Sequence, residues 1–148
     1  LTYKCNHQCI FCSCPWENDI SLSGNEMTAE QWKRVFEKVK IYGVKHITFS
    51  GGEPAIRADI FDILRYAKEL GFTLGLNTNG CNINKDFLYR LRDFDIQLSI
   101  SVPGIKTFAQ TTKNDNIENV LNLFRQCDKL NIKTVANIAV TKINIGII

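Results

Sequence analysis

The 148-residue sequence lacks the features that mark membrane-spanning, secreted and nucleic-acid-binding proteins. No run approaches the roughly 18 consecutive apolar residues of a transmembrane helix. The N-terminus has neither the charged start nor the apolar core of a signal peptide. The formal net charge is only +3, with 18 basic and 15 acidic residues dispersed along the chain. That balance is too weak to indicate a nucleic-acid surface, so we expect neither a membrane nor a nucleic acid among the partners.

Repeats and low-complexity stretches are also missing, and a content of 45% hydrophobic and 22% charged residues is typical of a globular protein. The length suits one ordinary domain or part of a larger one. The chain begins at Leu1 without a methionine and stops inside the apolar run INIGII. We therefore expect residues 1–148 to form one domain that is incomplete at its C-terminus and open to extension at its N-terminus.

Cysteine, by contrast, is plentiful, but its distribution does not suit a disulfide framework. Four of the six cysteines crowd into residues 5–14, whereas Cys81 and Cys127 lie far apart within otherwise regular patterns. Such clustering favours metal ligation in a reducing compartment, and we expect a cytoplasmic protein.

Apolar spacing predicts helices and strands in strict alternation. Thr28 and Gln31 have the spacing of a capping box before a helix that Gly43 ends. Three further helices are expected at about 58–70, from Asn84 to about Asp93, and from Asn114 or Asn116 to Leu130. Five strands are expected at LTYK (1–4), 44–50, 72–78, 95–102 and 132–140.

Alternation with strands that are apolar on both faces predicts an α/β fold with a parallel sheet and right-handed crossovers. A barrel and a doubly wound open sheet both fit this order. The choice between the two folds depends on four groups of cysteine, glycine and polar residues. Each group lies at or just beyond the C-terminal end of one of four successive strands: 5–12, 51–53, 78–80 and 99–101. A barrel collects all of these at one mouth, whereas an open sheet gathers only those near its switch point. The sequence therefore favours a TIM-like barrel.

The stretch CNHQCIFC places Cys5, Cys9 and Cys12 on one short loop. Tetrahedral iron or zinc normally takes four protein ligands, so three thiolates leave one metal position open for a substrate or cofactor. A zinc site that recruits Cys14 is the alternative, although the C-x-C spacing is strained for one tetrahedral ion. We otherwise expect Cys14 to be a free thiol or a substrate-side residue.

This stretch resembles the CxxxCxφxC signature of the radical S-adenosylmethionine (radical SAM) superfamily, and GGEP, TNG and the SIS strand follow in the family's order. The resemblance implies a partial (β/α)6 barrel, here cut off after about four βα units and a fifth strand. It implies that Cys5, Cys9 and Cys12 hold three irons of a [4Fe–4S] cluster. The fourth iron would bind the amino and carboxylate groups of S-adenosylmethionine. The resemblance also implies that Phe11 packs against the adenine of this cofactor.

GGEP follows the strand 44–50, where two glycines allow close backbone approach and positive φ. In the family this motif binds the methionine amino group, which assigns Gly51, Gly52 and Glu53 to the cofactor. A plain strand-to-helix turn with Pro54 as a helix-start residue is the alternative. Some forty residues after the cysteine signature, the motif makes the family assignment strong.

Other positions match the family less specifically. Asn79 in the TNG turn, Ser99 and Asn137 are assigned to the cofactor by resemblance. A plain Asn-Gly turn is the alternative for Asn79, and an inward-facing structural residue is the alternative for Asn137. Ser101 stands where the family often has Asp, which leaves a role there open. Lys4 and His7 are expected to be solvated loop residues. Cys81 is a weak candidate for the substrate side, and Cys127 is expected to be structural.

The implied activity is reductive cleavage of S-adenosylmethionine to a 5′-deoxyadenosyl radical that abstracts hydrogen from a substrate. An electron donor such as flavodoxin or ferredoxin is an expected partner. A peptide or protein substrate, as in SPASM-like members, is narrowly favoured over cofactor building and glycyl-radical activation. The alternative is a non-catalytic iron–sulfur or zinc-binding module.

Overall fold

The computed structural model describes residues 1–13 and 26–146. A four-stranded sheet of order β1-β2-β3-β4 forms its centre, and all three strand pairs are parallel. The strands are β1 (His46–Phe49), β2 (Thr73–Thr78), β3 (Gln97–Ser101) and β4 (Thr134–Asn137). Each neighbour in the sheet is the next strand in the chain, so the predicted alternating α/β fold is confirmed.

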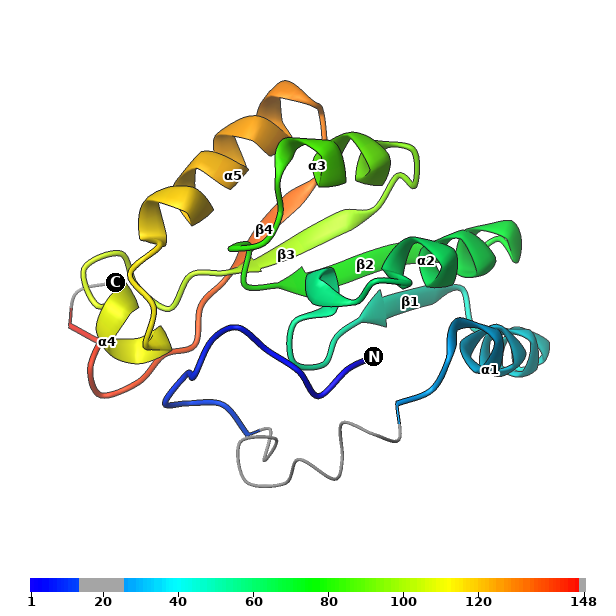
Figure 1. Cartoon of the computed structure of the whole chain (residues 1–148), viewed down its shortest axis with the longest axis horizontal. Coiled ribbons are helices and arrows are strands. Elements are labelled where there is room, and N and C mark those ends of the chain that lie inside the picture. Colours follow the sequence, from blue (N-terminus) through cyan, green and yellow to red (C-terminus); the bar gives the residue numbers. More distant parts are fainter. Residues whose placement is uncertain (14–25, 147–148) are drawn as a thin grey trace.

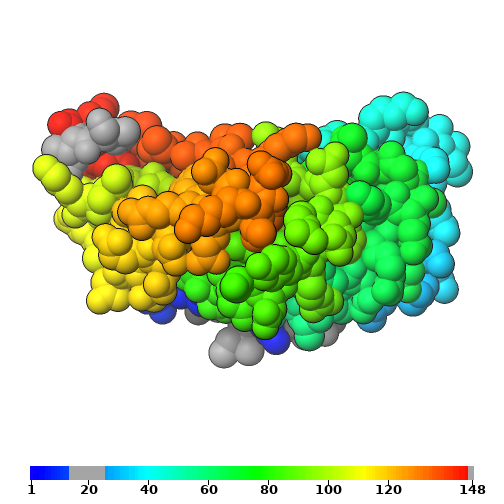
Figure 2. Space-filling model, turned by 90° about the horizontal axis from the view of Figure 1, so that it is seen from above, coloured from blue at the N-terminus to red at the C-terminus, as the bar shows by residue number. Residues whose placement is uncertain are grey.

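Helices connect the strands, and the longer ones cover one face of the sheet (Figure 1). They are α1 (Ala29–Ile41), the 3-10 turn η3 (Pro54–Ile56), α2 (Ile60–Glu69), α3 (Lys85–Arg92), α4 (Phe108–Thr112) and α5 (Ile117–Lys129). Figure 2 shows α5, α3 and α2 side by side as an outer layer. No helix in the two described ranges is long and apolar enough to cross a membrane.

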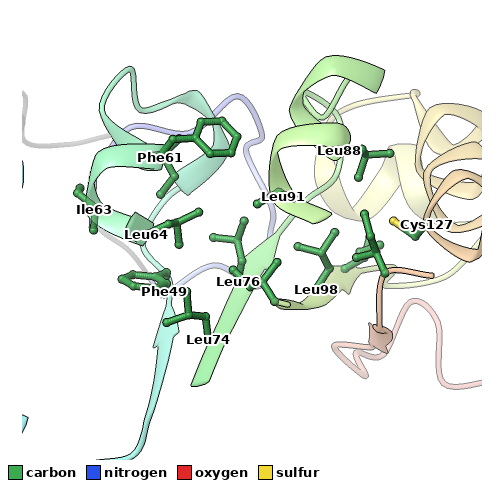
Figure 3. Packing of buried hydrophobic residues seen from close by; sticks show 14 of the residues in the cluster. Phe49, Phe61, Ile63, Leu64, Leu74, Leu76, Leu88, Leu91, Leu98 and Cys127 are labelled. Carbon is green, nitrogen blue, oxygen red and sulfur yellow. The ribbon is translucent and has the colours of Figure 1, made fainter. Parts of the chain in front are cut away.

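The hydrophobic core lies between the sheet and this helical layer (Figure 3). Leu76 of β2 and Leu98 of β3 are fully buried and face Leu64 of α2 and Leu91 of α3. Because side chains alternate along a strand, the intervening residues of β2 and β3 point to the opposite face. On that second face, which carries no helix in the described ranges, β2 and β3 present Thr73, Gly75, Asn77, Gln97, Ser99 and Ser101.

Local signals read from the sequence are present at the helix ends. Thr28 and Gln31 form the predicted capping box of α1, and Asn84 caps α3 by accepting a hydrogen bond from Phe87 N. The N-cap of α5 is Asn116, which settles the choice between Asn114 and Asn116. Gly43 lies just after the C-cap of α1 and has a φ of 82°, a conformation that favours glycine.

The expected strand at LTYK is wrong, because residues 1–4 are not part of a regular ladder. Gly52 N donates to Thr2 O at 2.6 Å and Glu53 N donates to Lys4 O at 2.8 Å, so the segment pairs with the loop beyond β1. A Cβ at Gly52 would collide with Lys4 O, which explains the glycine. The described residues therefore contain four strands and not five.

Helix α4 and the turn η3 were not expected from the sequence. In α4 the hydroxyl of Thr112 donates to Phe108 O at 2.8 Å, and that of Thr111 donates to Thr107 O at 2.9 Å. A five-residue helix with two β-branched threonines has low intrinsic propensity. Burial of Phe108, which is 1% exposed, anchors it instead.

Candidate functional site

A cleft of about 390 Å³ lies at the carboxyl ends of the strands. Five chain segments meet there, as the parallel topology requires. The lining includes every residue that the sequence assigned to metal or cofactor binding: Cys5, Cys9, Phe11, Cys12, Gly51, Gly52, Glu53, Asn79, Ser99 and Asn137. His7, Asn77 and Ser101 also line the cleft.

Strand register places polar side chains on the cleft side of the sheet. Asn77 of β2 pairs with Ser99 of β3, and Ser101 of β3 pairs with Asn137 of β4. These residues alternate with the leucines of the core, so they point away from the helices. Hydroxyl and amide groups from three strands therefore face one open space.

The three thiols Cys5, Cys9 and Cys12 share this space and form no disulfide. Cys12 N donates to Cys9 O at 3.0 Å, which folds the loop into a tight turn. Burial, together with the neighbouring thiols of Cys5 and Cys12, raises the pKa of the Cys9 thiol to about 11. Clustered thiolates repel one another, and a bound cationic metal group relieves that repulsion. This donor set fits a thiolate-ligated metal cluster.

A single metal ion fits the arrangement less well. Among residues 1–13 and 26–146, no three His, Cys, Asp or Glu side chains converge as the ligands of one ion would. In an iron–sulfur cluster each thiolate binds a different iron, so the sulfurs need not converge on one point. Cys14, the fourth thiol of the zinc alternative, lies outside the described residues.

Backbone hydrogen bonds fasten the cysteine segment, residues 5–13, to the end of α4. Gln8 N donates to Thr112 O at 3.1 Å and Ile10 N donates to Thr111 O at 2.9 Å. Helix termini leave their last carbonyl groups without intrahelical partners, and these two amides satisfy them. An element that the sequence did not reveal thus supports the cluster loop.

His7 is buried, contrary to the expectation of a solvated residue, whereas Lys4 is exposed as expected. The His7 ring stands edge-on to Phe108, with ring centroids 5.9 Å apart. Its Nε2 lies 3.1 Å from Cys81 Sγ. Burial lowers the pKa of His7, which favours the neutral ring that can pair with a thiol. His7 therefore fixes the cysteine segment from inside the protein. Its partner Cys81, a candidate for the substrate side, is not among the residues lining the cleft.

Asn79 connects the TNG turn to the cysteine segment. Its Nδ2 donates to Asn6 Oδ1 at 2.6 Å and lies 3.8 Å from Cys5 Sγ. Its Oδ1 accepts from Cys81 N at 3.0 Å. The side chain is thus engaged within the protein, although it borders the cleft. Cys127, by contrast, is fully buried in the core, as expected of a structural residue.

Glu53 is 1% exposed and is held by three donors. Oε1 accepts from the Thr78 hydroxyl at 2.7 Å and from Ala55 N at 3.0 Å, while Oε2 accepts from Asn79 N at 2.6 Å. Burial raises the pKa of Glu53, and the three hydrogen bonds oppose that effect. A carboxylate offers about four lone-pair sites, so one further donor can bind at Oε2. An ammonium group that binds there would also favour the ionised form.

Fold and cleft together define a parallel α/β partial barrel with three thiols and a buried carboxylate at its mouth. Residues 1–145 match the Radical SAM superfamily, and the chain belongs to this family. Family members use a [4Fe–4S] cluster and S-adenosylmethionine, and the donor set described above fits such a cluster.

The chain is similar to enzymes named PqqA peptide cyclase. It is 34% identical over 107 residues to the one from Bradyrhizobium diazoefficiens, covering 72% of this chain and 28% of that protein. It is 37% identical over 105 residues to the PqqA peptide cyclase from Rhodopseudomonas palustris, covering 70% of this chain and 27% of that protein. The chain thus spans less than a third of the length of these relatives.

Solved structures confirm the partial-barrel fold. Streptococcus suis SuiB bound to S-adenosylmethionine superimposes with a TM-score of 0.80 at 23% identity, over 95% of this chain and 31% of that one. The protein anSMEcpe with bound AdoMet superimposes with a TM-score of 0.81 at 18% identity, over 97% of this chain and 42% of that one. Other structures of these two proteins hold a precursor peptide, SuiA, and a Cp18Cys peptide.

Proposed function

We propose that this protein is a radical SAM enzyme in which Cys5, Cys9 and Cys12 hold a [4Fe–4S] cluster. The observation that carries the proposal is that the three thiols and Glu53 line one cleft at the carboxyl ends of the strands. When bound, the reduced cluster supplies the electron that cleaves S-adenosylmethionine to the 5′-deoxyadenosyl radical, which abstracts hydrogen from substrate.

The residues of the chain bind and orient the cofactor in this proposal. Glu53 offers the remaining acceptor site of Oε2 to the methionine ammonium group, beside the Gly51–Gly52 backbone. Ser99 and Asn137 offer a hydroxyl and an amide on the same wall, and Phe11 offers an apolar ring for the adenine. Asn79 contributes by fixing Asn6 and the loop near Cys5.

A peptide or protein is the proposed substrate class. The support comes from the relatives, which are named peptide cyclases or have been solved with a bound peptide. A flavodoxin or ferredoxin is the proposed electron donor, and the cytoplasm is the proposed location because thiolate ligands need a reducing compartment.

Anaerobic cluster reconstitution on the full-length protein tests the proposal. With dithionite and S-adenosylmethionine, we expect four irons per chain and release of 5′-deoxyadenosine. Cys9→Ala should abolish that product, whereas Cys127→Ala, in the core and away from the cleft, should retain it. One zinc in place of iron, or undiminished product from Cys9→Ala, would overturn the assignment.

A further inference from the structure

Arg57 lies four residues after Glu53, and its guanidinium group is nearly enclosed, with the side chain 9% exposed. Nε and Nη2 form a two-pronged pair with the Asp59 carboxylate, each at 2.7 Å. This fork orients the planar group and leaves its remaining donors aimed at other parts of the chain.

Those remaining donors reach backbone on both sides of the cysteines. Nη1 donates to Leu1 O at 2.6 Å, and Nη2 donates to Met27 O at 2.9 Å. Leu1 precedes the three cysteines in sequence and Met27 follows them. One side chain therefore joins the stretch just before the cysteine segment to the residues that lead into α1.

Glu26 completes the connection between these two stretches. Its Oε1 accepts from the Thr2 hydroxyl at 2.6 Å and from Tyr3 N at 2.9 Å. Its Oε2 lies 3.7 Å from Arg57 Nη1. The carboxylate thus joins the stretch before the cysteines to the stretch after them, and both to Arg57.

On the other side, the stretch before the cysteines pairs with the residues that lead into Glu53. Thr2 O and Lys4 O accept from Gly52 N and Glu53 N. A displacement of residues 1–4 would therefore alter the position of the cysteine segment relative to Glu53. The hydrogen bond from Arg57 Nη1 to Leu1 O opposes that displacement.

We propose that Arg57 is a positioning residue that ties residues 1–4 to the start of α1 and so sets the place of the cysteine segment relative to Glu53. The inference rests on the proposed function, because it assigns Arg57 to the retention of a cluster by Cys5, Cys9 and Cys12. Arg57 itself is not among the residues lining the cleft, and its side-chain hydrogen bonds go to Asp59, Leu1 O and Met27 O. Lysine cannot replace it, because a single ammonium group lacks the planar fork that serves Asp59 and two carbonyls at once.

The test compares Arg57→Lys with Arg65→Lys in the full-length protein. Arg65 is a matched control, since it pairs with Asp62 at 2.6 Å on the exposed surface of α2. After anaerobic reconstitution, cluster release to an iron chelator is followed by absorbance. We expect release to be about tenfold faster in Arg57→Lys and unchanged in Arg65→Lys.

Hydrogen exchange of the cluster-free proteins supplies a readout that needs no cofactor. Amides of residues 1–4 and 52–53 should exchange about tenfold faster in Arg57→Lys, with those of β3 unchanged. Glu26→Gln keeps the volume and the Oε1-type acceptor, so it should show a smaller shift in the same amides even where Arg57→Lys folds poorly. Equal chelator rates for the two arginine variants, or faster exchange spread evenly over the sheet, would overturn the proposal.

Failure of the proposed function has a different outcome. If the wild-type protein takes up no iron–sulfur cluster, the enzyme assignment fails. The exchange comparison then still decides whether Arg57 holds residues 1–4. If the cluster forms and Arg57→Lys retains it as well as Arg65→Lys does, the positioning role of Arg57 alone is wrong.

Discussion

Glu53 has two tasks at the scale of the single residue. Three of its four lone-pair sites accept hydrogen bonds from Thr78, Asn79 and Ala55, and one remains for a ligand. Its carboxylate therefore braces the end of β2 at the same time as it offers an acceptor to the cleft.

Glu53→Ala should weaken S-adenosylmethionine binding by about tenfold or more, because a charge-assisted hydrogen bond to the ammonium group is lost. Iron content should stay at the wild-type level, since the carboxylate is assigned to the cofactor and not to iron. Isothermal titration of the reconstituted full-length protein measures S-adenosylmethionine binding, and iron analysis measures the iron content. Glu69→Ala, on the exposed surface of α2, is the control. Iron loss as severe as in Cys9→Ala would show that the assignment is wrong.

The placement of the cysteines and Glu53 at one cleft could be predicted from the sequence, because the signal is the spacing of these residues along the chain. His7 and Arg57 could not, because their partners are distant in sequence. His7 meets Cys81, 74 residues away, and Arg57 meets Leu1, 56 residues away. A histidine two residues from a cluster cysteine gives no local indication that it is buried. Only the packed fold brings Phe108 and Cys81 to it.

At the scale of elements, the helices and strands with strong apolar periodicity were predicted, whereas α4 was not. Its C-terminal carbonyls, those of Thr111 and Thr112, accept from the cysteine segment. Lys113 follows with φ of 57°, a left-handed conformation that costs a non-glycine residue free energy. The end of α4 is therefore strained at the point where it supports the loop.

Lys113→Gly should raise the free energy of unfolding by about 0.5 kcal/mol, the relief of left-handed strain being partly offset by the greater entropy of the unfolded chain. Arg125 lies in the middle of α5 with its side chain exposed, and Arg125→Gly should lower the free energy of unfolding by about 1 kcal/mol. Denaturant titration of the cluster-free full-length protein measures both. Destabilisation by both glycines would mean that Lys113 is not strained in solution.

At the scale of the whole molecule, the sheet formed by the described residues has β1 and β4 as its edge strands. Val135 of β4 is 45% exposed, and Val140 beyond it is 61% exposed. Unpaired edge backbone beside apolar side chains favours association with other chains. The partial barrel expected from the sequence was confirmed, because strict alternation of strands and helices already indicates parallel strands that pair in chain order.

Residues 1–148 produced as a separate chain should self-associate at micromolar concentrations, and Val135→Lys should reduce this association about tenfold because an edge lysine opposes strand pairing. Sedimentation velocity measures the distribution of species. Lys133→Arg, a charge-preserving change just before β4, should behave like the parent chain. A monomeric parent chain would contradict the prediction.

The pairing register of the strands limits how this sequence can change in evolution. Ser99 and Ser101 face the cleft while Leu98 and Ile100 face the core, in strict alternation. Deletion of one residue within β3 would turn the serines toward the helices and the leucine and isoleucine toward the cleft. Substitutions can therefore tune the cleft one side chain at a time, whereas insertions and deletions are tolerated only in the connections. Homologues should differ in length between the strands and hardly ever within them.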